Sequence, residues 1–419
     1  MKKINFTNIN ETVFHEELPS GLNVYIYPSD KSSLYDMKLI VHVGSSDNTF
    51  YLDGKEIHIP NGVAHFLEHL TFNTKDGKVE DYYSSKGVYV NASTNFDNTT
   101  YTVRCNDSFL DNLMYLLNFV TEPYYTEELV ENERGIILEE ILTHMNMVDE
   151  KFYYKFCDNV FVNDSNKYQV GGIDTDVKSI SLADIVNTYD CFYKKNNMDL
   201  VLTGNIDVED TINKLIEWDK KENNEDIKRI ISDEPDSVNI ESETYTDLVS
   251  SKRMMLGYKL SRESIDLTNI EFDIYSSLLS DLMFGETSDI RLFCEKEDLF
   301  NDYIDSFFIE GFKHKVLTLE FESEDLDKAY DFITNYIKEF KIKEDDFKRK
   351  IKVMKSHLIT SFEDPKNVGG MLSRHLVKYN RIINDYYDIF DSLNIDKINE
   401  LLDLYRNSNS SYIKLLPKK

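Results

Sequence analysis

Residues 65 to 69, His-Phe-Leu-Glu-His, place two metal-binding side chains and one acidic side chain within five positions. On a helix, with about 100° between successive residues, His65, Glu68 and His69 fall within roughly 100° of one another. Two imidazoles one turn apart can bind a divalent cation such as zinc, and a nearby glutamate can act as a base toward water. The alternative is a helix with two hydrogen-bonded histidines and an incidental glutamate.

A catalytic zinc site takes three protein ligands, so a third ligand must come from elsewhere in the chain. The best source is the predicted helix 126–147, where Glu133 and Glu140 are seven residues apart and therefore about 20° apart on the helix. The apolar residues expected to flank them are Leu129, Ile136 and Ile137. The two carboxylates are thus expected at the centre of an apolar stripe, where they are costly to bury unless a zinc ion compensates them. His144 shares this face and is an alternative ligand or a packed core residue.

The elements that must position these side chains alternate between strand and helix patterns. A strand-like β-meander is predicted over 16–43 and a β-rich stretch over 87–104, whereas helices are predicted over 59–72, 107–120 and 126–147. The spacing does not follow strict βαβ units. The sequence therefore predicts an α+β fold, with antiparallel-rich mixed sheets and helices packed on one face of each sheet.

An internal similarity predicts two related domains. Residues 181–204 align without gaps on residues 394–417, and both segments read as a capped amphipathic helix, a polar turn and a strand. The polar, acidic stretch that follows the first copy is typical of a linker. We therefore expect a catalytic domain over 1–222, a linker over 223–240 and a non-catalytic homologous domain over 241–419.

The composition disfavours two classes of partner. The 419 residues carry a formal net charge of −29, whereas phosphate backbones and anionic membranes are bound by clustered Lys and Arg. We expect neither nucleic acid nor membrane as a partner.

The start of the sequence lacks the apolar run of a signal peptide, and the four cysteines are widely scattered. These features predict a cytoplasmic protein.

Four segments of the N-terminal half carry a family resemblance. They read GVAHFLEH at 62–69, NAST at 91–94, ERGIILEE at 133–140 and NMDLVLTGN at 197–205. In this order they resemble the inverzincin zinc peptidases, the family of pitrilysin, insulin-degrading enzyme and the mitochondrial processing peptidase, whose signature is an inverted His-x-x-Glu-His motif. The resemblance is strongest to the zinc-bearing subunit of bacterial two-subunit peptidases.

The resemblance implies a role for each residue of the predicted metal site. His65, His69 and Glu140 would hold one Zn²⁺ per chain, and Glu68 would be the general base. Glu133 would be an outer carboxylate that orients the catalytic site.

The resemblance also implies how a peptide is held. Asn91 and Ala92 would lie on an exposed edge strand to which the substrate backbone adds as a further strand. The alternative for this segment is an ordinary strand of the sheet. The two homologous domains would form half of a clamshell chamber that encloses an extended peptide, so the implied activity is that of a metalloendopeptidase.

The C-terminal half departs from the family pattern. It has no His-x-x-Glu-His motif, and the positions of a substrate-binding arginine and tyrosine are occupied by Cys294 and Asn301, with Arg291 and Tyr303 nearby at a different spacing. We therefore expect a heterodimer with a homologous zinc-free subunit that supplies these groups, or else a homodimer. The implied function is leader-peptide removal from a ribosomally made, modified peptide. The alternatives are a non-catalytic docking subunit and a general oligopeptide-degrading peptidase.

Overall fold

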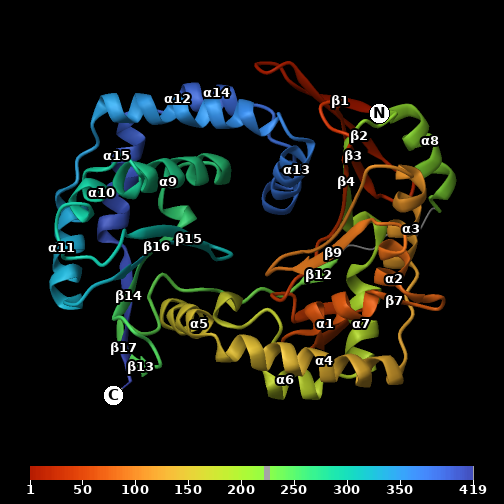
Figure 1. Ribbon diagram of the computed structural model, residues 1–419, viewed down its shortest axis with the longest axis horizontal. Helices are drawn as coiled ribbons and strands as arrows, with labels where there is room; N and C mark the ends of the chain where they lie inside the picture. Colours follow the sequence, from red (N-terminus) through yellow and green to blue (C-terminus); the bar gives the residue numbers. More distant parts are fainter. Residues whose placement is uncertain (221–226, 419) are drawn as a thin grey trace. The chain divides into compact units, whose positions relative to one another are not determined.

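The computed structural model describes residues 1–220 and 227–418, and the chain divides into two compact units (Figure 1). Unit 1 comprises Met1–Thr143, Gln169–Ile231 and His357–Asp385, and unit 2 comprises His144–Tyr168, Ser232–Ser356 and Tyr386–Lys419. Each unit therefore takes segments from both halves of the sequence, unlike the contiguous domains 1–222 and 241–419 that we predicted. Of the predicted linker 223–240, residues 223–226 lie outside the described residues.

Unit 1 is built on a sheet, here called the first sheet, with the strand order β1-β2-β3-β11-β4-β10-β9 in the described residues. Its strands are β1 (Lys2–Phe6), β2 (Glu11–Glu17), β3 (Asn23–Pro28), β4 (Tyr35–Val41), β9 (Tyr89–Thr94), β10 (Thr99–Cys105) and β11 (Met198–Gly204). Strand β11 lies between β3 and β4, parallel to β3 and antiparallel to β4. The β-meander predicted over 16–43 is therefore wrong at this point, because the fully buried β11 occupies the centre of the sheet.

Several helices of unit 1 cover one face of the first sheet. The helices of this unit, apart from α13, are α1 (Val63–Thr71), α2 (Val79–Ser84), α3 (Phe109–Thr121), most of α4 (Glu127–Asn146), α6 (Asp174–Ser179), α7 (Leu182–Phe192) and α8 (Val208–Trp218). Phe66, Leu113 and Ile185, from α1, α3 and α7, are fully buried in one core with Leu39 and Leu200 of the sheet. This packing fixes the position of α1, which begins four residues later than the predicted helix 59–72.

A helix from the C-terminal half covers the opposite face of the first sheet. Helix α13 (Pro365–Tyr379), drawn in blue, lies beside the red strands β2 to β4 in Figure 1. Its buried Val368 and Leu372 form a core with Tyr27, Ile40 and Val201 of the sheet. The central strands β3, β4 and β11 are thus buried on both faces of the first sheet, which the sequence did not predict.

Unit 2 repeats the arrangement of the first sheet. Its sheet, the second sheet, has the order β13-β17-β14-β16-β15 in the described part of the chain. The strands are β13 (Ser242–Asp247), β14 (Arg253–Ser261), β15 (Asp305–Glu310), β16 (His314–Glu322) and β17 (Asn409–Pro417). Strand β17 is parallel to β13 and antiparallel to β14, as β11 is to β3 and β4. The predicted repeat is confirmed in its elements, because α7–β11 and α15–β17 occupy equivalent places.

Among the helices of unit 2, α5 (Val148–Val160), α9 (Asn269–Phe284) and α15 (Ile395–Asn407) contact strands of the second sheet. The unit also contains α10 (Asp289–Cys294), α11 (Leu326–Glu339), most of α12 (Glu344–Ser361) and α14 (Tyr386–Ser392). Helix α5 belongs to this unit because its Phe152 and Phe156 are buried against Val316 and Ile413 of the second sheet. The predicted α+β architecture with two homologous domains is confirmed.

The remaining elements are small. Strands β5 (Thr49–Leu52), β6 (Lys55–His58) and β12 (Lys228–Arg229) form one sheet, and β7 (Asn73–Thr74) pairs with β8 (Gly77–Lys78). Short 3-10 helices lie at Ser165–Lys167, Lys195–Asn197 and Arg262–Ser264. Across the described residues, no helix combines the length and the hydrophobicity needed to cross a bilayer.

Candidate metal centre

Helix α1 presents the His-x-x-Glu-His segment as the sequence predicted. Its apolar residues Val63, Phe66, Leu67 and Leu70 are fully buried, so the intervening His65 and His69 lie at the edge of the core with side chains 16% and 24% exposed. The helix begins after Gly62, which has a φ of 89°. A Cβ atom at this position would lie 2.3 Å from the Gly171 carbonyl oxygen. Only glycine fits this turn, which sets the start of the helix.

Helix α4 brings the carboxylates of Glu133 and Glu140 to the same region. The buried residues of this helix are Val130, Ile137 and Ile141. Ile136, which we expected to flank the two glutamates within an apolar stripe, is 50% exposed. At about 100° per residue, the glutamates lie between Ile136 and the buried stripe. They therefore lie at the edge of the stripe and not at its centre, where their carboxylates can reach α1.

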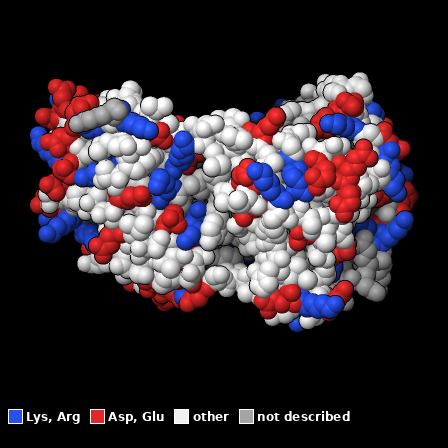
Figure 2. Space-filling model, turned by 90° about the horizontal axis from the view of Figure 1, so that it is seen from below, with Lys and Arg blue, Asp and Glu red and all other residues white. Residues whose placement is uncertain are grey.

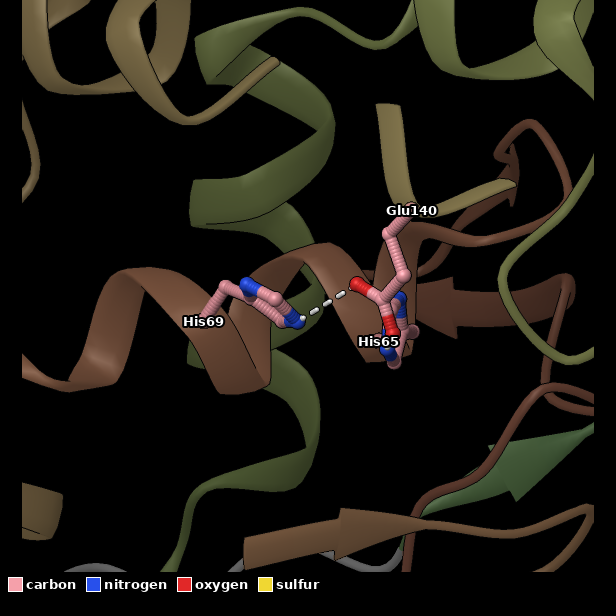
Figure 3. A group of neighbouring side chains, drawn as sticks. All are labelled: His65, His69 and Glu140. Carbon is pink, nitrogen blue, oxygen red and sulfur yellow. Dashed lines mark ion pairs between the residues drawn. The ribbon is translucent and has the colours of Figure 1, made fainter. Parts of the chain in front are cut away.

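The side chains of His65, His69 and Glu140 converge (Figure 3). The distance from Nε2 of His69 to Oε2 of Glu140 is 3.4 Å, and that from Nε2 of His65 to Oε1 of Glu140 is 3.8 Å. One ligand atom from each residue lies within 4.8 Å of the other two. Ligands bound tetrahedrally at about 2.0–2.1 Å would be separated by about 3.3–3.4 Å. Two imidazoles and a carboxylate at these separations therefore fit a zinc ion.

The Glu133 carboxylate contacts the other nitrogen of His69. Oε1 of Glu133 accepts a hydrogen bond from Nδ1 of His69 at 2.9 Å. This bond leaves Nε2 of His69 directed toward Glu140. Burial lowers the pKa of His69, but the hydrogen bond to Glu133 and the charge of Glu140 outweigh burial and raise the pKa above its ordinary value. Without a cation, two carboxylates thus favour a protonated His69; a bound cation would replace that proton.

Glu68 lies on α1 between the two histidines and is only 8% exposed. Its Oε2 accepts a hydrogen bond of 2.5 Å from the hydroxyl of Thr94. Burial raises the pKa of Glu68, while the Thr94 hydroxyl and the charge of His69 act in the opposite direction. A buried carboxylate with a raised pKa beside a metal site is suited to accept and return a proton.

The segment predicted to bind the peptide backbone is strand β9, the last strand of the first sheet. Its Ala92 pairs with Tyr101 and its Asn91 pairs with Thr102 of β10 on one side. On its other side no strand of the described chain pairs with it. Asn91 is exposed and Ala92 is half-buried. The geometry is that of an edge strand, and the binding role of Asn91 and Ala92 stays a prediction.

Two further sets of predicted residues lie outside the metal centre. His144, the alternative ligand, is not in the group of three; its Nδ1 lies 2.6 Å from Oε1 of Glu150. In unit 2, the guanidinium of Arg291 lies over the ring of Tyr303. Among the described residues, no second group of His, Cys, Asp and Glu has ligand atoms this close together.

The contact between Thr94 and Glu68 is a feature of the site that we did not predict from the sequence. The signal was present, because side chains alternate along a strand and Thr94 therefore shares a face with Val90 and Ala92. Val90 and Ala92 pack against the core that contains α1. What the sequence does not reveal is which residue of α1 Thr94 meets.

Comparison with known families identifies both parts of the chain. Residues 26–156 match the family described as insulinase (peptidase family M16). Residues 179–354 match the family described as the peptidase M16 inactive domain. The first match contains all the predicted metal ligands, and the second covers most of the part that lacks the His-x-x-Glu-His motif.

Individual relatives agree with this assignment. The uncharacterized zinc protease YmfH of Bacillus subtilis is 30% identical over 316 residues, which cover 74% of this chain and 72% of YmfH. An M16-like peptidase from Alicyclobacillus acidocaldarius has a similar fold, with a TM-score of 0.89 at 22% identity over 97% of this chain and 98% of that chain. The periplasmic protease PqqL of Escherichia coli has a TM-score of 0.74 at 18% identity over 96% of this chain, but this chain covers only 47% of PqqL.

Proposed function

Because the chain belongs to the insulinase family of peptidases, we propose that it is a zinc-dependent endopeptidase that hydrolyses extended peptides. The observation that carries this proposal is the convergence of His65, His69 and Glu140 from two helices far apart in the sequence. Their donor set and spacing suit one Zn²⁺ per chain. Relatives such as YmfH are named zinc proteases, which supports the same cofactor.

The chemistry is divided between the metal and the chain. When bound, zinc supplies Lewis acidity that activates a water molecule and polarises the peptide carbonyl. Glu68 accepts a proton from the attacking water while the water oxygen bonds to the carbonyl carbon. Glu68 then gives this proton to the amine nitrogen as the C–N bond breaks. Glu133 holds the His69 ring in orientation through Nδ1.

Strand β9 is the proposed binding site for the peptide backbone. A substrate that pairs with its open edge is held by main-chain hydrogen bonds at Asn91 and Ala92, so many sequences are accepted as long as they are extended. The exposed Asn91 and the position of β9 at the end of the first sheet support this role.

The proposed partner is a second chain of the same fold. PqqL, of which this chain covers 47%, is about twice as long and therefore has room for two such halves. Cys294 and Asn301 stand where the family has an arginine and a tyrosine. This substitution favours a distinct, zinc-free partner that supplies both side chains over a homodimer.

Nucleic acid and membrane are not proposed as partners, because the net charge is −29. On the face shown in Figure 2, Lys and Arg side chains lie among Asp and Glu side chains.

The finer substrate assignment is removal of a leader peptide from a ribosomally made, modified peptide, with general oligopeptide degradation as the alternative. It rests on the resemblance to two-subunit bacterial peptidases. We place this activity in the cytoplasm on the basis of the sequence composition, while the solved relative PqqL is a periplasmic protease. A precursor peptide tested beside unrelated peptides of equal length distinguishes the two substrate classes.

The proposed activity is tested with the purified chain, alone and with a homologous zinc-free chain, on internally quenched extended peptides. The Glu68→Gln variant should retain zinc and lose about 10²- to 10⁴-fold in kcat. The matched control is Glu139→Gln, since Glu139 is exposed on α4 and should leave cleavage unchanged. Cleavage by Glu68→Gln at the wild-type rate would refute the role of Glu68. A zinc-loaded wild-type chain that cleaves nothing in either preparation would indicate a docking subunit instead.

A further inference from the structure

Thr94 ends strand β9 and its side chain points toward helix α1. The side chains of β9 alternate in exposure, with Asn91 and Ser93 exposed and Ala92 and Thr94 half-buried. The hydroxyl of Thr94 lies 2.5 Å from Oε2 of Glu68. One residue thus belongs to the proposed peptide-binding strand and also contacts the proposed base.

The proton positions in this contact follow from the neighbouring hydrogen bonds. The hydroxyl of Thr99, 3.3 Å from that of Thr94, donates its proton to the Val43 carbonyl at 3.0 Å. An ionised carboxylate can only accept hydrogen bonds. Thr94 must therefore be the donor to Glu68. The hydroxyl has a single proton and donates it to Glu68. This bond holds Oε2 in a defined place as long as Glu68 is ionised.

We propose that Thr94 is a positioning residue for Glu68, which couples the base to the strand that binds the peptide; this inference rests on the proposed function. In the proposed function the strand binds substrate through its main chain, whereas the Thr94 hydroxyl donates its proton to Glu68. Loss of the hydroxyl therefore affects turnover and spares peptide binding. A purely structural role for Thr94 would not separate kcat from KM in this way.

The kinetic test compares two variants of Thr94 with one control. Thr94→Val removes the hydroxyl at constant volume and should lower kcat about 10- to 100-fold, with KM changed by less than about 3-fold. Thr94→Ser keeps the hydroxyl and should restore kcat to within about 3-fold of wild type. Thr102→Val makes the same change on β10, opposite Asn91, and should leave kcat unchanged. Equal losses in Thr94→Ser and Thr94→Val, or no loss in Thr94→Val, would overturn the proposal.

A second test does not depend on activity. In the metal-free chain, Thr94→Val should lower the Tm, because the buried Glu68 carboxylate loses the hydrogen bond from the Thr94 hydroxyl and keeps only the one from the Thr94 backbone. In a Glu68→Leu background the same change should leave the Tm nearly unaltered. Equal decreases in both backgrounds would show that Thr94 does not hold Glu68. If the wild-type chain proves inactive, the proposed function fails, while this pair of Tm shifts still decides whether the contact exists.

Discussion

Replacement of Glu133 should weaken zinc binding although Glu133 is not itself one of the three converging residues. Its carboxylate accepts a 2.9 Å hydrogen bond from Nδ1 of His69 and is 14% exposed, so solvent screens it only partly. Hydrogen bonds to charged groups contribute about 1.5–3 kcal/mol. Loss of such an outer partner typically lowers metal affinity about 10- to 100-fold, which corresponds to about 1.4–2.7 kcal/mol. We expect Glu133→Ala to lie near the middle of this range.

Glu133→Gln refines the prediction, because its amide oxygen can still accept the His69 proton without a negative charge. It should weaken zinc binding by less than Glu133→Ala does. The assay is a competition titration of the metal-free protein against a chromophoric zinc chelator at constant pH and ionic strength. Glu139→Ala is the control, since this residue is exposed on the same helix. Wild-type affinity in Glu133→Ala, or an equal loss in the control, would refute the argument.

Two further predictions concern stability. Burial lowers the pKa of His375 from 6.5 to about 3, and its Nδ1 accepts the Ile383 N–H at 3.3 Å. The unfolded chain therefore binds a proton at pH 5.5 that the folded chain does not, so stability present above pH 6.5 is lost as the pH falls. This should cost about 1.4 kcal/mol at pH 5.5, measured as the part of the urea-unfolding pH dependence that His375→Gln abolishes. Gly257→Val should destabilise the fold by about 1–3 kcal/mol, because a Cβ atom would lie 2.6 Å from Cζ of Phe156 and 2.9 Å from Cγ1 of Val316.

Each of these predictions has a defined contrary result. An identical pH dependence in the wild type and in His375→Gln would show that His375 is protonated in the folded chain. For Gly257 the control is Gly135→Ala on α4, where no heavy atom lies within 4 Å of the added Cβ. Alanine there should be neutral or stabilising. Unfolding of Gly257→Val at the wild-type urea concentration would contradict the close packing of α5 on the second sheet.

The candidate site could be predicted because its geometry is largely local. The spacing of His65 and His69 places them one turn apart on any helix, and the spacing of Glu133 and Glu140 places both carboxylates on one side of another. These relations hold without knowledge of the tertiary fold. The error over Ile136 arose because periodicity gives the angle between residues but not the direction of the core, which lies toward Ile137.

The packing of α5 on the second sheet and of α13 on the first sheet could not be predicted in this way. The apolar faces of α5 and α13 are visible as periodic patterns, with Phe152 and Phe156 on one and Val368 and Leu372 on the other. Periodicity does not show which sheet such a face covers. The neighbours of β11 could not be predicted for the same reason. A continuous apolar strand indicates a central position in a sheet but does not show which strands pair with it.

The proposed function depends on the binding of one zinc ion by His65, His69 and Glu140 together. X-ray absorption at the zinc edge, combined with metal analysis of the purified chain, measures this binding. We predict one zinc per chain with nitrogen and oxygen ligands at about 2.0–2.1 Å, including two imidazoles, and loss of most of the zinc in Glu140→Ala. A spectrum with sulfur ligands, or full zinc occupancy with an unchanged spectrum in Glu140→Ala, would contradict it.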